Sequence, residues 1–235
     1  NRNFFAGEFA GTTGTFNNTA ACKNVAIGNS AGSNLNASGS YVANRNVYVG
    51  NCAAIAATTS CYNTVVGADA GIGMTNHSAY SNVLLGFCAG RNIEGARNIA
   101  IGQVSLDRVC TGYGNIGIGY KAGRNTAGST VSNNISIGQL AGDGFITGCK
   151  NLFLGHYAGR NLIAPTGINA LCNVFVGSDA FNGAYAGGLF CENTVVGNRA
   201  GARAEGLGIT TDLSFNVFLG SCAGCYTKGS CNIFI

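Results

Sequence analysis

The side chains in this chain best suited to chemistry are its thiols: 11 of the 235 residues are Cys. Many recur at equivalent places along the chain or nine residues apart, and residues so placed can come within the Cα range that a disulfide accepts. So many Cys also favour an oxidising compartment. We therefore expect cross-links among a group of seven: Cys52, Cys61, Cys149, Cys172, Cys191, Cys222 and Cys231. The alternative is that they are free thiols, packed as small apolar groups.

Other chemistry has less support in the sequence. Cys222 and Cys225, with Cys231 nearby, have a spacing that zinc could use, but no His lies near them. Neither His77 nor His156 recurs at a fixed distance from a Cys, as a nucleophile and its base would. The nine acidic residues repeat at no ligand spacing. We predict a protein that is not an enzyme and has no metal site or cofactor.

These side chains are carried by a tandem repeat that runs through the whole chain. Its clearest copy is Asn151–Gly159: Asn, three residues with apolar first and third members, Gly, two variable residues, then Ala-Gly. We number each copy from its Asn as position N. Copies recur 16 to 23 residues apart and begin at Asn3, Asn24, Asn46, Asn63, Asn82, Asn98, Asn115, Asn134, Asn151, Asn173, Asn193 and Asn216, with a partial copy at Asn232. Self-similarity at such a period is typical of a solenoid.

The fixed positions have structural explanations. Gly at N+4 follows a short strand, where a sharp turn needs positive φ. The Ala at N+7 is small because a narrow solenoid has little interior room, and the Asn side chains can form an amide ladder between coils. The pairs that we assign to this framework are Asn24 and Gly28, Asn63 and Gly67, Asn115 and Gly119, Asn151 and Gly155, Asn193 and Gly197, and Asn216 and Gly220.

We predict an all-β fold, a single-chain parallel β-solenoid of about 12 short coils. It should form one domain over residues 1–235, which is either complete or a segment of a longer array. Positions N+1 and N+3 share one strand face, and N+2 points the other way. Because N+2 is often aromatic, we expect it to be covered by another chain. The candidate interface residues are Phe5, Tyr48, Phe153, Phe175, Phe218 and Phe234.

The charge pattern argues against two classes of partner. The net charge is +4, with the bases scattered rather than clustered, so we expect no nucleic-acid binding. No apolar run approaches the ~20 residues of a membrane-spanning helix, so we expect no membrane insertion. The sequence Ala-Gly-Arg-Asn occurs three times, and its bases Arg91, Arg124 and Arg160 begin the variable loop. They are either solvated turn residues or a stripe that contacts a glycan or a neighbouring subunit.

The repeat resembles the head repeats of YadA-like trimeric autotransporter adhesins, as at Asn24-Val25-Ala26-Ile27-Gly28, and similar arrays in phage and virus tail fibres. The resemblance covers essentially the whole chain. It implies a left-handed β-roll on the outside of a cell or virion. We therefore expect a structural building block of an extracellular fibre, which assembles with copies of itself as a homotrimer or a head-to-tail filament through apolar strand faces and open ends. The alternative is an adhesin or fibre shaft that binds cell-surface glycans or proteins.

Overall fold

The computed structural model describes residues 2–11, 22–35, 37–38, 41–75, 78–125, 131–144, 148–161, 170–183, 190–202, 213–227 and 229–235. Backbone contacts divide the chain into two compact units, Asn1–Gly114 and Asn115–Ile235. Within the described residues both units are all-β and contain no helix. Every repeat Asn is followed directly by a short strand, so the predicted parallel β-solenoid is confirmed. That the two units form one domain over 1–235 stays a prediction.

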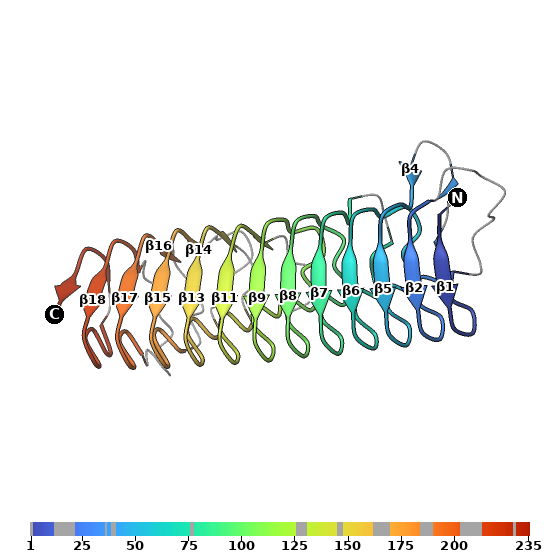
Figure 1. Cartoon of the computed structure of the whole chain (residues 1–235). Helices are drawn as coiled ribbons and strands as arrows, with labels where there is room; N and C mark the ends of the chain where they lie inside the picture. The colour runs from blue at the N-terminus through green and yellow to red at the C-terminus, as the bar shows by residue number, and fades with distance from the viewer. Residues whose placement is uncertain are drawn as a thin grey trace. The chain divides into compact units, whose positions relative to one another are not determined.

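The first unit has one long parallel sheet, to which each repeat contributes one strand (Figure 1). Neighbouring strands pair without a shift, as Ala26 does with Tyr48 and Tyr48 with Val65. A small antiparallel pair, β3 (Ala37–Ser38) and β4 (Tyr41–Val42), lies outside this sheet. The strands of the long sheet are β1 (Phe4–Ala6), β2 (Val25–Ile27), β5 (Val47–Val49), β6 (Thr64–Val66), β7 (Val83–Leu85) and β8 (Ile99–Ile101).

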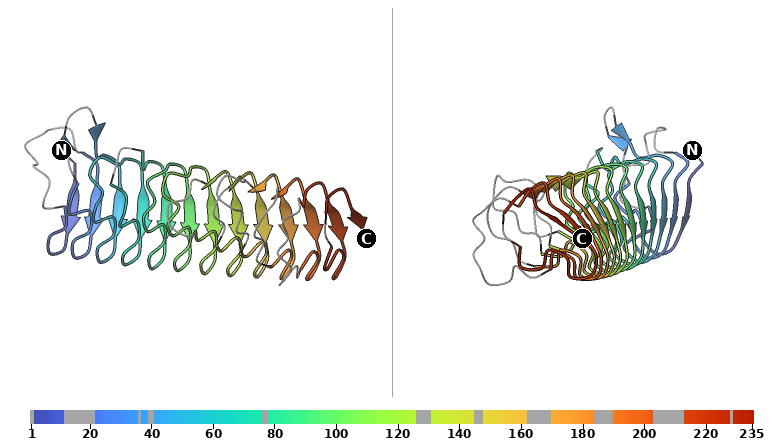
Figure 2. Two further views of the ribbon diagram at one scale, coloured as in Figure 1. Left: turned by 180° about the vertical axis from the view of Figure 1, so that it is seen from behind. Right: turned by 90° about the vertical axis from the view of Figure 1, so that its left-hand side faces the viewer.

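The second unit repeats this arrangement and adds a second sheet (Figure 2). Its long parallel sheet is formed by β9 (Ile116–Ile118), β11 (Ile135–Ile137), β13 (Leu152–Leu154), β15 (Val174–Val176), β17 (Thr194–Val196), β18 (Val217–Leu219) and β19 (Ile233–Phe234). The second sheet comes from the segments just before four of these strands: β10 (Val131–Ser132), β12 (Gly148–Cys149), β14 (Ala170–Leu171) and β16 (Phe190–Cys191).

The core of each unit lies on the N+2 side of the long sheet. Tyr48, Phe153, Phe175 and Phe218 are at most 1% exposed within this single chain. The rings of Phe153 and Phe175 are in register on neighbouring strands, with centroids 5.6 Å apart. The prediction that these four side chains contact another chain is therefore wrong, because the narrow coil itself encloses them.

The other two candidate interface residues occupy the same column but are less covered. Phe5 in β1 is half-buried and packs near Gly11, and Phe234 in β19 is 42% exposed. The ring of Phe234 still lies 5.5 Å from that of Phe218. Both side chains therefore belong to the inward-facing column, so their orientation also contradicts a separate outer interface at N+2.

The small fixed residues line the opposite wall of the coil. Ala158, at N+7, is fully buried. Gly159, at N+8, has φ +63°, and a Cβ there would lie 2.4 Å from the Phe153 ring. Gly155, at N+4, has φ +134°, and a Cβ would lie 2.4 Å from the carbonyl oxygen of Gly177 on the next coil. Backbone conformation and close stacking therefore both require Gly.

The repeat Asn residues form the predicted amide ladder within each unit. The Asn151 side-chain NH₂ donates to Asn134 Oδ1 and to the Ala170 carbonyl, each at 2.9 Å. Its own Oδ1 accepts the backbone N–H and the side-chain NH₂ of Asn173, at 3.0 and 2.9 Å. Asn151 is only 2% exposed, so the ladder satisfies polar groups that water cannot reach. This bonding explains why Asn recurs at position N.

Candidate functional site

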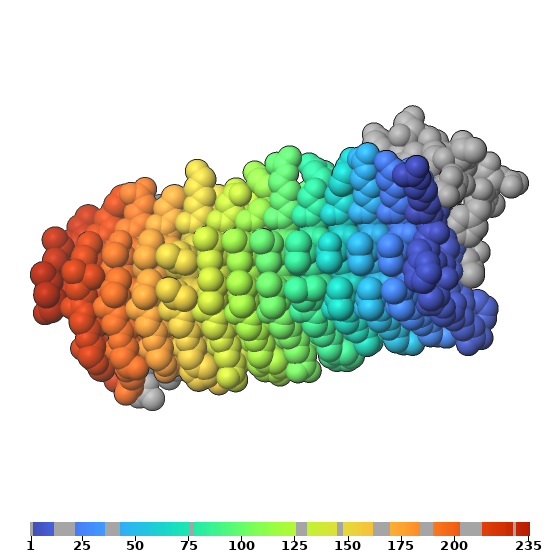
Figure 3. Space-filling model, viewed as in Figure 1, coloured from blue at the N-terminus to red at the C-terminus, as the bar shows by residue number. Residues whose placement is uncertain are grey.

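The outer face of each long sheet is apolar and open to solvent. Positions N+1 and N+3 carry no charged residue in any copy. In the second unit Leu154, Val196 and Leu219 are 39%, 38% and 37% exposed. The first unit matches this, with 39% for Ile27 and 37% for Val66. In the space-filling view, the atoms of successive coils form aligned rows (Figure 3).

This uncharged face is unusual for a sheet in contact with water. Solvent-facing sheets normally carry polar side chains on that side, which limits aggregation. For one unit we estimate about 50 Å² from each of about twelve side chains, on the order of 600 Å², which is at the upper end for the largest apolar patch of a monomer. The sheet faces are therefore the candidate assembly surface, and N+1 and N+3 supply it in place of N+2.

The cysteines are all free thiols, so the predicted disulfides are wrong. One reason is register. Cys149 pairs with Leu171, and Leu171 pairs with Cys191, so two coil steps separate the two thiols. Cys172 follows Leu171 and has a left-handed backbone, φ 56°. It is therefore one residue out of register with Cys149 and with Cys191. The same outcome applies to the other four, Cys52, Cys61, Cys222 and Cys231.

Among the described residues, the remaining thiols and His156 form no recognisable Cys–His reactive centre. Cys225 Sγ lies 3.0 Å from the Arg199 carbonyl oxygen, and burial raises the pKa of its thiol. His156 is exposed, and its ring contacts Tyr157 at a centroid distance of 3.8 Å. His77 lies outside the described residues. Among the described residues no three His, Cys, Asp or Glu side chains are grouped to hold a metal ion.

The three Arg residues of the repeated Ala-Gly-Arg-Asn sequence form ion pairs between coils. In the second unit Arg124 Nε lies 2.7 Å from Asp143 Oδ1, and Arg160 Nε lies 3.9 Å from Asp143 Oδ2. In the first unit Arg91 and Asp107 pair at 3.0 Å. Both Asp side chains are 3% exposed. These Arg residues therefore neutralise buried carboxylates, a role that their recurrence alone did not reveal.

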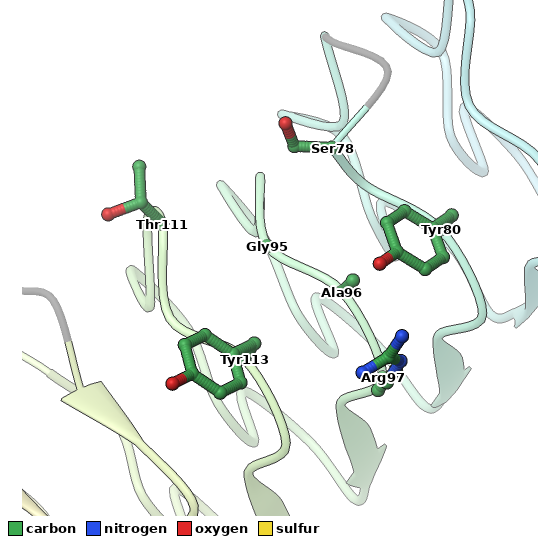
Figure 4. Close-up of a pocket in the computed structure, with 7 residues that line it drawn as sticks. All are labelled: Ser78, Tyr80, Gly95, Ala96, Arg97, Thr111 and Tyr113. Carbon is green, nitrogen blue, oxygen red and sulfur yellow. The ribbon is translucent and has the colours of Figure 1, made fainter.

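A groove in the first unit crosses three successive coils just before their strands (Figure 4). Its volume is about 360 Å³, within the range of small-ligand sites. Tyr80 and Tyr113 stand at position N−2 on the outer two coils, and Ala96 occupies N−2 on the coil between them. The backbone fixes this order, because the N–H of Arg97 donates to the Tyr80 carbonyl and that of Gly114 donates to the Ala96 carbonyl, at 2.9 and 3.0 Å.

The groove combines aromatic, hydroxyl and cationic groups. Ser78 and Thr111 lie two residues before the two Tyr residues, at equivalent positions on opposite walls. Arg97 has a left-handed backbone, φ 59°, and its guanidinium lies over the Tyr80 ring, 5.6 Å from the centroid. Such cation–π contacts orient the Arg group. The sequence alone did not predict this groove. A signal was present, because Ser78 and Thr111 each lie two residues before a Tyr at N−2, and the coil between them has Ala96 at N−2.

Comparison with protein-family models, with curated proteins and with solved structures gave no match. The resemblance to YadA-like head repeats and tail-fibre arrays therefore stays a prediction. Within the described residues no helix is long and apolar enough to cross a membrane.

Proposed function

We propose that this protein is a non-enzymatic structural building block of a fibre or filament, and that it assembles with copies of itself through the outer faces of its long sheets. The observation that carries the proposal is the uncharged apolar face at N+1 and N+3. In each unit this face presents aliphatic side chains such as Val66 and Val196, which are 37% and 38% exposed. Burying such area is the main driving force for association.

The size and pattern of the face support a second copy as the partner. On the order of 600 Å² per unit and per partner would bury about 1,200 Å² between two copies, which reaches the lower limit of stable interfaces. The ridges of one copy repeat at the strand spacing of about 4.8 Å, so a second copy offers grooves at the same period. Because the face carries no charge, a charged partner would have no counterpart there.

The partner number and the location belong to the same proposal. A homotrimer or a head-to-tail filament would bury the apolar face, and a filament would also pair open strand edges of neighbouring copies. We propose an extracellular or surface location, for which the support is the resemblance of the repeat to adhesin heads and tail fibres. The alternative, a shaft that binds surface glycans or proteins, is favoured by one observation only, the groove between Tyr80 and Tyr113.

Sedimentation velocity over a range of concentrations tests assembly through this face. The double variant Val66→Glu and Val196→Glu places one charge on each sheet face, and we expect it to shift the chain from oligomers to monomers. Phe87→Glu is the control, because Phe87 is exposed but lies in a turn at N+5. Circular dichroism confirms that each variant is folded. A monomeric wild-type chain, or a double variant that assembles like the control, would contradict the proposal.

A further inference from the structure

One turn of the second unit brings two thiols together. Cys222 and Cys225 stand at N+6 and N+9 of the copy that begins at Asn216, with only Ala and Gly between them. Cys222 has a left-handed backbone, φ 57°, and the N–H of Cys225 donates to its carbonyl at 3.2 Å. A bond from residue i+3 to residue i closes a turn whose end Cα atoms are less than about 7 Å apart. A disulfide accepts Cα separations of about 4.4–6.8 Å, so this turn can carry one.

No other copy of the repeat has this pair. Cys52 and Cys88 also stand at N+6, but the residues at N+9 of their copies are Ile55 and Arg91. The disulfides ruled out above joined thiols of different coils or of different turns, whereas these two thiols share one turn. The pair is therefore a separate feature of the copy that begins at Asn216.

The two thiols have different surroundings. Cys222 is exposed, whereas Cys225 is half-buried and its Sγ donates to the Arg199 carbonyl on the preceding coil at 3.0 Å. Burial, followed by the charge and the side-chain hydrogen bond of the neighbouring Cys222, raises the pKa of the Cys225 thiol. Cys225 therefore holds its proton, while Cys222 is the thiol that a molecule in solution can reach.

A positive charge stands beside the pair. Arg199 occupies N+6 of the preceding coil, the position equivalent to that of Cys222, and its side chain is exposed. The two turns are stacked, because the N–H of Cys222 donates to the Asn198 carbonyl at 2.9 Å. A nearby cation favours the thiolate, which is the form of Cys that attacks a disulfide. Exposure and charge therefore both select Cys222 as the attacking thiol.

We propose that Cys222 and Cys225 form a redox-active dithiol that reduces small-molecule disulfides by thiol–disulfide exchange. The Cys222 thiolate attacks one sulfur of the small disulfide, which breaks its S–S bond and forms a mixed disulfide. The other sulfur leaves as a thiolate and takes a proton from water. Cys225 then gives its proton to water and attacks Cys222 Sγ, which forms the Cys222–Cys225 disulfide and releases the second small thiol.

This exchange moves two electrons from the dithiol to the small disulfide, and an excess of the small thiol reverses it. Each chain reacts once and is then oxidised, so the exchange is stoichiometric. The site goes beyond the assembly function, because it lies in the turn from N+6 to N+9 and not on the sheet face.

Equilibration of the folded full chain with buffers of reduced and oxidised glutathione tests the proposal. Each sample is quenched with acid, alkylated, digested with trypsin and analysed by mass spectrometry. Cleavage after Arg203 and after Lys228 gives one peptide that contains Cys222 and Cys225 and no other Cys. In the more oxidising buffers we expect this peptide to change from two alkylated thiols to an internal disulfide. The peptide that contains Cys52 and Cys88 should stay alkylated.

Single variants separate the two roles. In Cys225→Ser the second step is lost, so the mixed disulfide of Cys222 with glutathione should accumulate. In Cys222→Ser the remaining thiol is half-buried and holds its proton, so we expect about tenfold less mixed disulfide. Cys52→Ser is the matched control, since Cys52 shares position N+6 but has no Cys partner at N+9. It should leave the exchange at Cys222 and Cys225 unchanged.

Circular dichroism of each variant separates lost exchange from lost folding. The sheet-face variant Val66→Glu and Val196→Glu should keep the exchange, so this proposal and the assembly proposal can fail independently. The inference is overturned if the wild-type peptide keeps both thiols in the most oxidising buffer. It is also overturned if wild-type Cys52 is oxidised as readily as Cys222, or if Cys222→Ser and Cys225→Ser accumulate equal amounts of mixed disulfide.

Discussion

Replacing Asn151, inside the amide ladder, should lower the free energy of unfolding far more than replacing Asn232, at the edge of the ladder. Asn151→Ala removes the donor at 2.9 Å from the Ala170 carbonyl and the acceptor at 3.0 Å from the Asn173 backbone N–H. Ala170 and Asn173 are at most 1% exposed, so water cannot replace the lost partners. A buried polar group without a partner costs about 1–3 kcal/mol, so two such groups should lower the free energy of unfolding by about 2–6 kcal/mol.

Asn232→Ala is the internal control for this prediction. Asn232 donates to Asn216 Oδ1 at 3.0 Å, but it is only partly buried, so water can replace the missing group. We expect a loss of about 1 kcal/mol. Urea unfolding followed by far-ultraviolet circular dichroism gives both values. Because solenoid coils interact only with their neighbours, amide hydrogen exchange at Asn173 should report local opening as well. Equal losses for the two variants would refute the claim that the ladder satisfies buried groups.

Three further predictions follow from single positions. Gly155→Ala should lose about 3 kcal/mol more than Gly229→Ala in urea unfolding, because both have positive φ but only Gly155 has a backbone atom of the next coil within 2.4 Å of the new Cβ. Burial raises the pKa of Tyr48 above its usual value, so the unfolded state loses the phenol proton at a lower pH than the folded state does. The free energy of unfolding therefore keeps its full value below pH ~10 and falls as the pH rises above it. In urea unfolding at alkaline pH, it should fall less steeply for Tyr48→Phe. Thiol titration of the denatured chain without reductant should find 11 free thiols, and a smaller number would support the disulfide prediction instead. In the folded chain, the exposed Cys172 should react faster than Cys88, which is buried and whose thiol pKa is raised by that burial.

The repeat framework could be predicted from sequence because its residues are constrained by the backbone. Gly155 is required by positive φ and by the approach of the next coil, and Asn151 by its ladder bonds. Such constraints recur in every copy, so the pattern shows them directly. The same reasoning failed for Phe153, since alternation shows that N+2 opposes N+1 and N+3 but not which face is inside. A single coil encloses that large ring, and the aliphatic side chains lie outside.

Features that depend on relations between coils were harder to predict. Loops of unequal length hide which residues align, so Cys149 and Cys172 seemed equivalent although their register differs by one residue. The pairing of Arg124 with Asp143 is hidden in the same way, because the two charges occur in different copies of the repeat. A one-residue difference decides which face a side chain occupies, and only the structure fixes it.

The central claim, that this chain assembles through the outer faces of its sheets, is tested most directly by electron cryomicroscopy of the purified protein. The account predicts particles or filaments in which copies meet along the columns that contain Val66 and Val196, with those side chains buried between chains. Single chains with that face in solvent, at concentrations where the protein is otherwise intact, would contradict it.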